Sequence, residues 1–122
     1  MLNAKLDLTI MSGVRDGTPL SLSNTVGHGI WENGVWVVRV GRNSDNDLPL
    51  NDDDFSSGYH AKLIQRLDGW WLQDCGSTNG TFIDNGIDDE RMAKSAIAAL
   101  EPGQLFRIGR TWMRIDPPQI DK

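Results

Sequence analysis

Residues 74–82 read DCGSTNGTF, a row of small and polar residues between two apolar, strand-like stretches. The stretch GWWLQD precedes the row, and a second apolar stretch begins at Phe82. The row therefore connects two strands. A two-residue turn is enough to join neighbouring antiparallel strands, yet Gly76 to Thr81 form six consecutive small or polar residues. The extra length suggests that this connection also holds a ligand or another part of the molecule.

The sequence on both sides of this row has the pattern of short β-strands. Residues 5–10, KLDLTI, alternate polar and apolar side chains, which is typical of a half-buried strand. Short turn sequences at residues 67–69 and 109–110 separate apolar runs and indicate hairpins. Regularly spaced short strands predict an all-β sandwich or barrel. Residues 88–100, DDERMAKSAIAAL, are the exception, because they contain helix formers and neither Gly nor Pro; we expect a long loop with one or two helical turns.

Length and composition narrow the class of protein. The 122 residues and 13.6 kDa correspond to one domain. A net charge of -5 and a pI near 4.8 argue against electrostatic nucleic-acid binding. No apolar run approaches the roughly 20 residues of a membrane span, and the N-terminus lacks an apolar signal core. With one cysteine, Cys75, the chain has no internal disulfide. These observations predict a cytoplasmic protein without a membrane partner.

Three polar clusters stand where apolar runs stop. The first is Gly41 with Arg42, the second is SSGYH at residues 56–60, and the third is the row at residues 76–81. Strand ends can meet at one end of a sandwich, so we expect the three clusters to converge. Together they offer a guanidinium, hydroxyls, an amide and backbone N–H groups, which suit a tetrahedral anion such as phosphate. Arginine favours this assignment because its planar fork pairs with two oxygens at once.

The order and spacing of these clusters resemble the forkhead-associated (FHA) domain family. The matching motifs run from Gly41 to Gly109: Gly-Arg, Asn-Asp, Ser-x-x-His, Gly-Ser-x-Asn-Gly-Thr and a final strand ending in Ile-Gly. The resemblance implies an eleven-stranded antiparallel β-sandwich over residues 1–116, followed by a flexible tail at 117–122. It also implies phosphothreonine binding, with a Ser/Thr kinase or its substrates as partners. Residues 88–100 form an insertion relative to the family pattern.

The resemblance assigns roles to individual residues. Arg42 would bind the phosphate, Ser57 would donate its hydroxyl to it, and Gly58 would offer a backbone N–H where the family often has Arg or Asn. Thr78 would shape the phosphothreonine pocket, and the Asn79 side chain would hold the ligand backbone. Structural roles fall on Gly41, His60 and Gly80. Ser56 is the alternative to Ser57, because Phe55 could take the apolar position that normally precedes the phosphate-binding serine.

Other functions fit the sequence less well. Ser57 and His60 lack the G-x-S-x-G setting of a hydrolase nucleophile, and the glycine-containing row lacks the Lys of a nucleotide P-loop. The run Asp52–Asp54 does not form a calcium loop, so we expect a solvated acidic loop. The sequence thus predicts no catalytic activity, no cofactor and no metal. The alternative function is a scaffold module of the same fold that docks unphosphorylated protein.

The acidic run also leads to an expectation about ligand preference. No basic residue lies between Asn43 and Tyr59, so an acidic ligand residue near Phe55 would face three carboxylates and no cation. We therefore expect an apolar or basic residue three positions after the phosphothreonine to be preferred over Asp. A preference for Asp or Glu there would instead mean that a basic residue from the insertion, Arg91 or Lys94, lies over the site.

Overall fold

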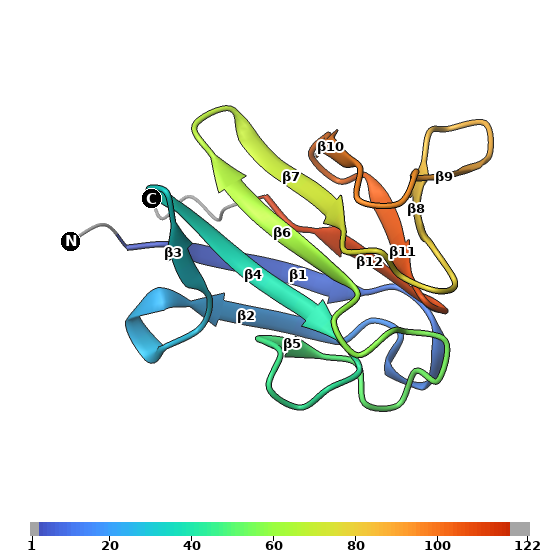
Figure 1. The fold of residues 1–122 in the computed structure, drawn as a ribbon, viewed down its shortest axis with the longest axis horizontal. Coiled ribbons are helices and arrows are strands. Elements are labelled where there is room, and N and C mark those ends of the chain that lie inside the picture. The colour runs from blue at the N-terminus through green and yellow to red at the C-terminus, as the bar shows by residue number, and fades with distance from the viewer. Residues whose placement is uncertain (1–2, 118–122) are drawn as a thin grey trace.

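The computed structural model describes residues 3–117, so residues 118–122 of the predicted tail lie outside the described part of the chain. Two β-sheets pack face to face (Figure 1). The first sheet has the strand order β2-β1-β12-β11-β8-β9. Its strands span Pro19–Ser23, Lys5–Ile10, Thr111–Ile115, Leu105–Ile108, Thr81–Asp84 and Asp89–Arg91, in that order.

The second sheet has the order β10-β7-β6-β4-β3, and β5 pairs with β4. Its strands span Ile97–Leu100, Gly69–Asp74, Ala61–Arg66, Val35–Gly41 and Ile30–Glu32, with β5 at Leu48–Pro49. All pairings are antiparallel except that of β4 with β5. Within residues 3–117 the strands number twelve rather than the eleven expected, and the all-β sandwich is confirmed.

Alternation along the strands builds the core between the sheets. In β1 every second side chain is buried, as the pattern of KLDLTI predicts. The largest fully buried side chains include Trp36 from β4 in the second sheet and Phe106 from β11 in the first. The ring of Trp36 also meets that of Trp70 edge to face, with centroids 6.0 Å apart. Side chains from both sheets therefore interdigitate in one shared core.

The insertion at residues 88–100 contains strands, so the expectation of helical turns there was wrong. Residues 89–91 pair with β8 and residues 97–100 pair with β7, which places the two segments at the edges of different sheets. A sheet edge offers unpaired N–H and C=O groups, and pairing with them outweighs a weak helix propensity. The helical turns lie elsewhere, as 3-10 turns at Gly13–Arg15 and Asn24–Val26. Among the described residues, no helix is long and apolar enough to cross a membrane.

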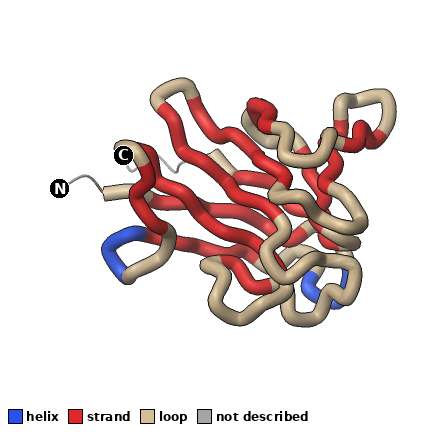
Figure 2. The backbone as a smooth tube through the Cα atoms, in the orientation of Figure 1, coloured by secondary structure: helices blue, strands red, loops and turns tan. Residues whose placement is uncertain are grey.

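The loops that carry the three polar clusters gather at one end of the sandwich. We call them the arginine loop (residues 42–47), the serine loop (residues 50–60) and the glycine loop (residues 75–80). β4 and β7 end there and β6 begins there, at the right of Figure 1, where loops and turns predominate (Figure 2). The turn between β11 and β12 reaches the same end, because Arg110 N donates a hydrogen bond to Asp53 in the serine loop.

Candidate functional site

Arg42 begins the arginine loop directly after β4, beside the serine loop. Its backbone N–H donates to the carbonyl oxygen of Ser57 at 2.9 Å, and the N–H of Asn43 donates to that of Gly58 at 3.2 Å. The guanidinium is exposed, and its Nη1 lies 3.4 Å from the carbonyl oxygen of Asp54. Backbone hydrogen bonds therefore hold an exposed guanidinium against the segment that contains Ser57.

Gly41 allows this close approach of the two loops. A Cβ atom at this position would overlap the Gly58 carbonyl and lie 2.9 Å from the His60 nitrogen, both of which belong to the backbone. Backbone atoms cannot rotate away as the end of a flexible side chain can. The glycine is thus required by packing rather than by an unusual backbone angle.

The two candidate serines differ in their surroundings. Ser56 is 2% exposed, and its hydroxyl donates to the carbonyl oxygen of Asp53 at 2.8 Å. Ser57 is partly exposed, and its Oγ accepts a hydrogen bond from the Thr78 N–H at 3.1 Å. Of the two serines, only Ser57 is partly exposed and lies between the arginine and glycine loops. Its hydroxyl is therefore the one that a ligand can reach.

His60 lies fully buried between the serine and glycine loops. Its Nδ1 accepts a hydrogen bond from the Ser57 N–H at 2.9 Å, and its Nε2 lies 2.9 Å from the carbonyl oxygen of Gly80. These contacts require a neutral ring with the proton on Nε2. Burial lowers the pKa of His60, against the opposing effects of the Gly80 carbonyl and the Asp74 carboxylate. His60 connects two loops of the site and has no access to a ligand.

Asp74 organises the glycine loop and was not singled out from the sequence. One carboxylate oxygen accepts from the hydroxyls of Ser77 and Thr81, and the other accepts from the N–H groups of Gly76, Ser77 and Ser95. Desolvation raises the pKa of this buried carboxyl, but the hydrogen bonds outweigh it, and the pKa is lowered overall. The sequence did contain a signal, because an Asp side chain commonly accepts a hydrogen bond from the backbone two residues on, here from Gly76 N.

Thr78 and Asn79 lie exposed at the tip of the glycine loop. The amide of Asn79 donates to the carbonyl oxygen of Phe55 at 3.0 Å, which places Asn79 against the serine loop. Gly80 follows with a φ of 94°, an angle that favours glycine. The structure thus brings Arg42, Ser57, Thr78 and Asn79 together at one end of the sandwich, with Gly58 partly exposed beside them.

The acidic run at residues 52–54 is not a solvated loop throughout. Asp53 is 5% exposed, and its carboxylate accepts hydrogen bonds from Phe55 N, Arg110 N and the Thr111 hydroxyl. Buried backbone and hydroxyl donors need an acceptor, and the carboxylate supplies one. The expectation of a wholly solvated run was therefore wrong for Asp53. Asp52 forms an ion pair with Arg15 at 3.0 Å.

Arg110 is a cation beside the site that the sequence did not indicate. Its guanidinium carbon lies 3.6 Å from the centroid of the Phe55 ring, a cation–π arrangement. The expectation that no basic residue lies near Phe55 was therefore wrong. It relied on positions close in sequence, whereas Arg110 arrives from the β11–β12 turn.

Comparison with known proteins places this architecture in a family. The FHA domain model matches residues 38–109, which includes all three loops. This chain belongs to the FHA domain family. The FHA domain is 34% identical over 111 residues to the FHA domain-containing protein FhaB of Mycolicibacterium smegmatis. That alignment covers 90% of this chain and 59% of the relative, so the chain spans little more than half of that protein's length.

Solved structures share the fold of this FHA domain. The FHA domain of an Arabidopsis thaliana hypothetical protein superimposes with a TM-score of 0.70 at 23% identity, covering 96% of this chain and 91% of that one. Mycobacterium tuberculosis EmbR, solved in complex with a low-affinity phosphopeptide, gives a TM-score of 0.65 at 23% identity. That match covers 93% of this chain and 24% of EmbR.

Proposed function

We propose that this FHA domain binds phosphothreonine-containing segments of partner proteins in Ser/Thr kinase signalling. The observation that carries the proposal is the convergence of Arg42, Ser57 and Asn79 from three separate loops on one end of the sandwich. The structural similarity to EmbR, which was solved with a phosphopeptide, supports it. The partner would be a Ser/Thr kinase or one of its substrates, and the site would act without catalysis or cofactor in the cytoplasm.

Each group of the site has a role suited to phosphate. Arg42 forms no ion pair among residues 3–117, so its guanidinium can pair with two phosphate oxygens. Ser57 Oγ accepts a hydrogen bond from Thr78 N, which leaves its own proton available to donate to a third oxygen. The Gly58 N–H would add a further donor. Thr78 would enclose the threonine methyl, and Asn79 would bind the ligand backbone.

The test is a calorimetric titration with a phosphothreonine peptide and its unphosphorylated twin. We expect affinity on the order of micromolar for the phosphopeptide only. Arg42→Ala should abolish this binding, because loss of one partner from an engaged charge pair costs roughly 2–5 kcal/mol. Arg66→Ala is the matched control, since Arg66 is an exposed arginine in the β6–β7 hairpin, stacked on Trp71. Affinity within threefold of wild type for Arg42→Ala would refute the phosphate role.

The scaffold function makes a different prediction in the same experiment. A module that docks unmodified protein would bind both peptides equally, and its affinity would not depend on Arg42. That outcome would replace the phosphothreonine proposal with the scaffold one.

A further inference from the structure

A row of alternating aromatic and arginine side chains crosses the outer face of the first sheet. Trp112 pairs with Arg107 across β12 and β11, Arg107 with Phe82 across β11 and β8, and Phe82 with Arg91 across β8 and β9. Directly paired residues project from the same face of a sheet. Their sequence neighbours, including Phe106, Ile108 and Ile83, are buried in the core, so the row faces outward. We call these four residues the arginine row.

Stacking on aromatic rings holds the guanidinium groups in place. The guanidinium carbon of Arg107 lies 3.9 Å from the Phe82 ring centroid and 5.6 Å from that of Trp112. That of Arg91 lies 5.9 Å from the Phe82 centroid. A stacked guanidinium has its flat face covered, while its N–H edges can still donate to carboxylate oxygens. The row thus presents donors whose side chains have already lost part of their rotational freedom.

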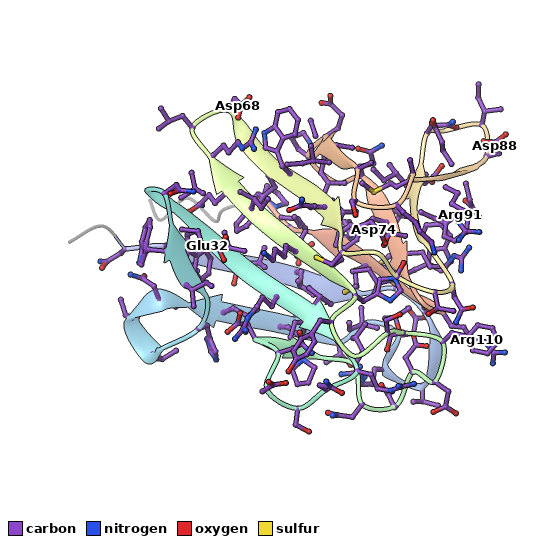
Figure 3. All side chains as sticks on the ribbon, in the orientation of Figure 1. Glu32, Asp68, Asp74, Asp88, Arg91 and Arg110 are labelled. Carbon is purple, nitrogen blue, oxygen red and sulfur yellow. The ribbon has the colours of Figure 1, made fainter. Side chains whose placement is uncertain are left out.

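The arginine row is continuous with the proposed phosphopeptide site. Arg107 Nη1 donates to the Gly109 carbonyl oxygen at 2.7 Å, which directs this side chain toward the turn that carries Arg110. Arg91 lies over the glycine loop, since a Cβ atom on Gly80 would be 2.8 Å from Arg91 Nε. In Figure 3, Arg91 and Arg110 extend from the same end of the molecule.

Asn79 is the point at which the two surfaces meet. Its amide donates to the Phe55 carbonyl oxygen, and the Phe55 ring carries the Arg110 guanidinium. Arg91 approaches the next residue of the glycine loop, Gly80. Asn79 therefore lies between an arginine on the serine-loop side and an arginine on the β9 side, and a ligand at Asn79 would be within reach of both.

Within residues 3–117 these three arginines have no carboxylate partner, although the domain is acidic. The chain carries a net charge of -5, and a carboxylate should be easy to find. Five other basic side chains do form ion pairs: Lys5, Arg15, Arg39, Lys62 and Arg114. Within residues 3–117, Arg91, Arg107 and Arg110 form none. The site end therefore combines unneutralised positive charge with an otherwise acidic surface, which attracts and orients an anionic segment.

We propose that the partner segment bearing the phosphothreonine is acidic, and that its carboxylates bind Arg91, Arg107 and Arg110. This inference rests on the proposed phosphothreonine function and specifies the partner. The row crosses four strands about 4.8 Å apart, or roughly 14 Å, which an extended chain covers in about four residues. This proposal reverses the sequence-based expectation that acidic ligand residues are disfavoured, because that expectation counted only the charges close to Phe55 in the sequence.

The experiment compares phosphothreonine peptides that differ only in their flanks. One peptide carries four Asp or Glu residues after the phosphothreonine, a second carries them before it, and the controls replace them with Asn or Gln. Each is titrated at low and physiological salt against the wild-type domain and against Arg91→Gln, Arg110→Gln and Arg66→Gln. Arg66 stacks on Trp71 with the guanidinium carbon 4.8 Å from the ring centroid, so it is a matched arginine away from the site.

We expect at least one acidic peptide to bind roughly three- to tenfold more tightly than its amide twin, with a smaller ratio at higher salt. The ratio should fall in Arg91→Gln and Arg110→Gln and stay at the wild-type value in Arg66→Gln. A ratio of one in the wild type, or a ratio unchanged in both site variants, overturns the proposal. Displacement of the acidic peptide by a single-stranded oligonucleotide would assign the row to nucleic acid and would also overturn it.

The amide-flanked peptides separate this proposal from the function on which it rests. If they bind and respond to Arg42→Ala while acidic flanks add nothing, the phosphothreonine function stands and only the acidic partner is refuted. If no phosphothreonine peptide binds with any flank, both proposals fail together.

Discussion

The Nε2 atom of His60 lies 2.9 Å from the carbonyl oxygen of Gly80, and this contact links the serine loop to the glycine loop. The other ring nitrogen accepts from Ser57 N, so one buried imidazole is hydrogen-bonded to both loops. A second proton on the ring would have to displace the Ser57 N–H. The geometry of the site therefore depends on a neutral His60.

We expect the free energy of unfolding to fall as the pH decreases from about 7.5 to about 5. The pKa of His60 is lowered below 6.5 by burial, so its stabilising effect is fully present above pH 6.5 and is lost as the pH falls toward the lowered pKa. One proton limits the slope to about 1.4 kcal/mol per pH unit. Urea denaturation across this range measures it.

The variant His60→Gln separates the contribution of His60 to the pH dependence from that of other titrating groups. His60→Gln should be less stable than wild type near pH 7.5, and the gap should narrow at lower pH, because the variant has no imidazole to protonate. A constant gap between His60→Gln and wild type would contradict the prediction.

Asp74→Asn should destabilise the fold by about 2–3 kcal/mol near neutral pH, because the NH2 group that replaces one carboxylate oxygen cannot accept a hydrogen bond and would face buried donors. The pKa of Asp74 is lowered below 3.8. Its stabilisation is therefore present above pH 3.8 and is lost as the pH falls toward the lowered pKa, so the difference from wild type should shrink there. Asp68→Asn is the control, because Asp68 accepts one hydrogen bond, from Trp71, in an exposed turn. Equal effects of the two substitutions would rule out this role for Asp74.

The two serines should separate binding from stability. Ser57→Ala should weaken phosphopeptide binding by about 1.5–3 kcal/mol, the value of a hydrogen bond to a charged group, with little effect on unfolding. Ser56→Ala should leave affinity unchanged and reduce stability by about 1 kcal/mol, since its buried hydroxyl donates to the Asp53 carbonyl. Calorimetry and urea denaturation on both variants test this. Greater loss of affinity in Ser56→Ala would reverse the assignment.

A phosphothreonine peptide should bind about fourfold better than the matching phosphoserine peptide. The estimate is the transfer free energy of one buried methyl group, about 0.8 kcal/mol, and close packing would increase it. Thr78, exposed at the tip of the glycine loop, is the residue expected to enclose the methyl, so Thr78→Ala should reduce the ratio. Equal affinities for the two peptides in the wild-type domain would show that the pocket does not enclose the methyl.

Local pattern was enough to predict much of this molecule from its sequence. Alternation in KLDLTI and turn residues between apolar runs indicated an all-β sandwich, and the order of the polar clusters indicated the family. Side-chain direction along a strand repeats every two residues, and turn preferences depend on the turn residues themselves. Both are therefore readable without knowing what packs on them. The convergence of the three loops followed, because each begins where an apolar run ends.

Tertiary structure alone decided which segments pair at the edges of the sheets and which charged side chains lie around the site. Residues 97–100 form a strand because β7 offers an unpaired edge, and Asp53 is buried because Arg110 N and the Thr111 hydroxyl need an acceptor. Arg110 reaches Phe55 because the β11–β12 turn packs against the serine loop. The two hydrogen bonds to Asp53 join residues more than fifty positions apart. Their energies depend on which groups folding brings together, and local propensity carries no information about that.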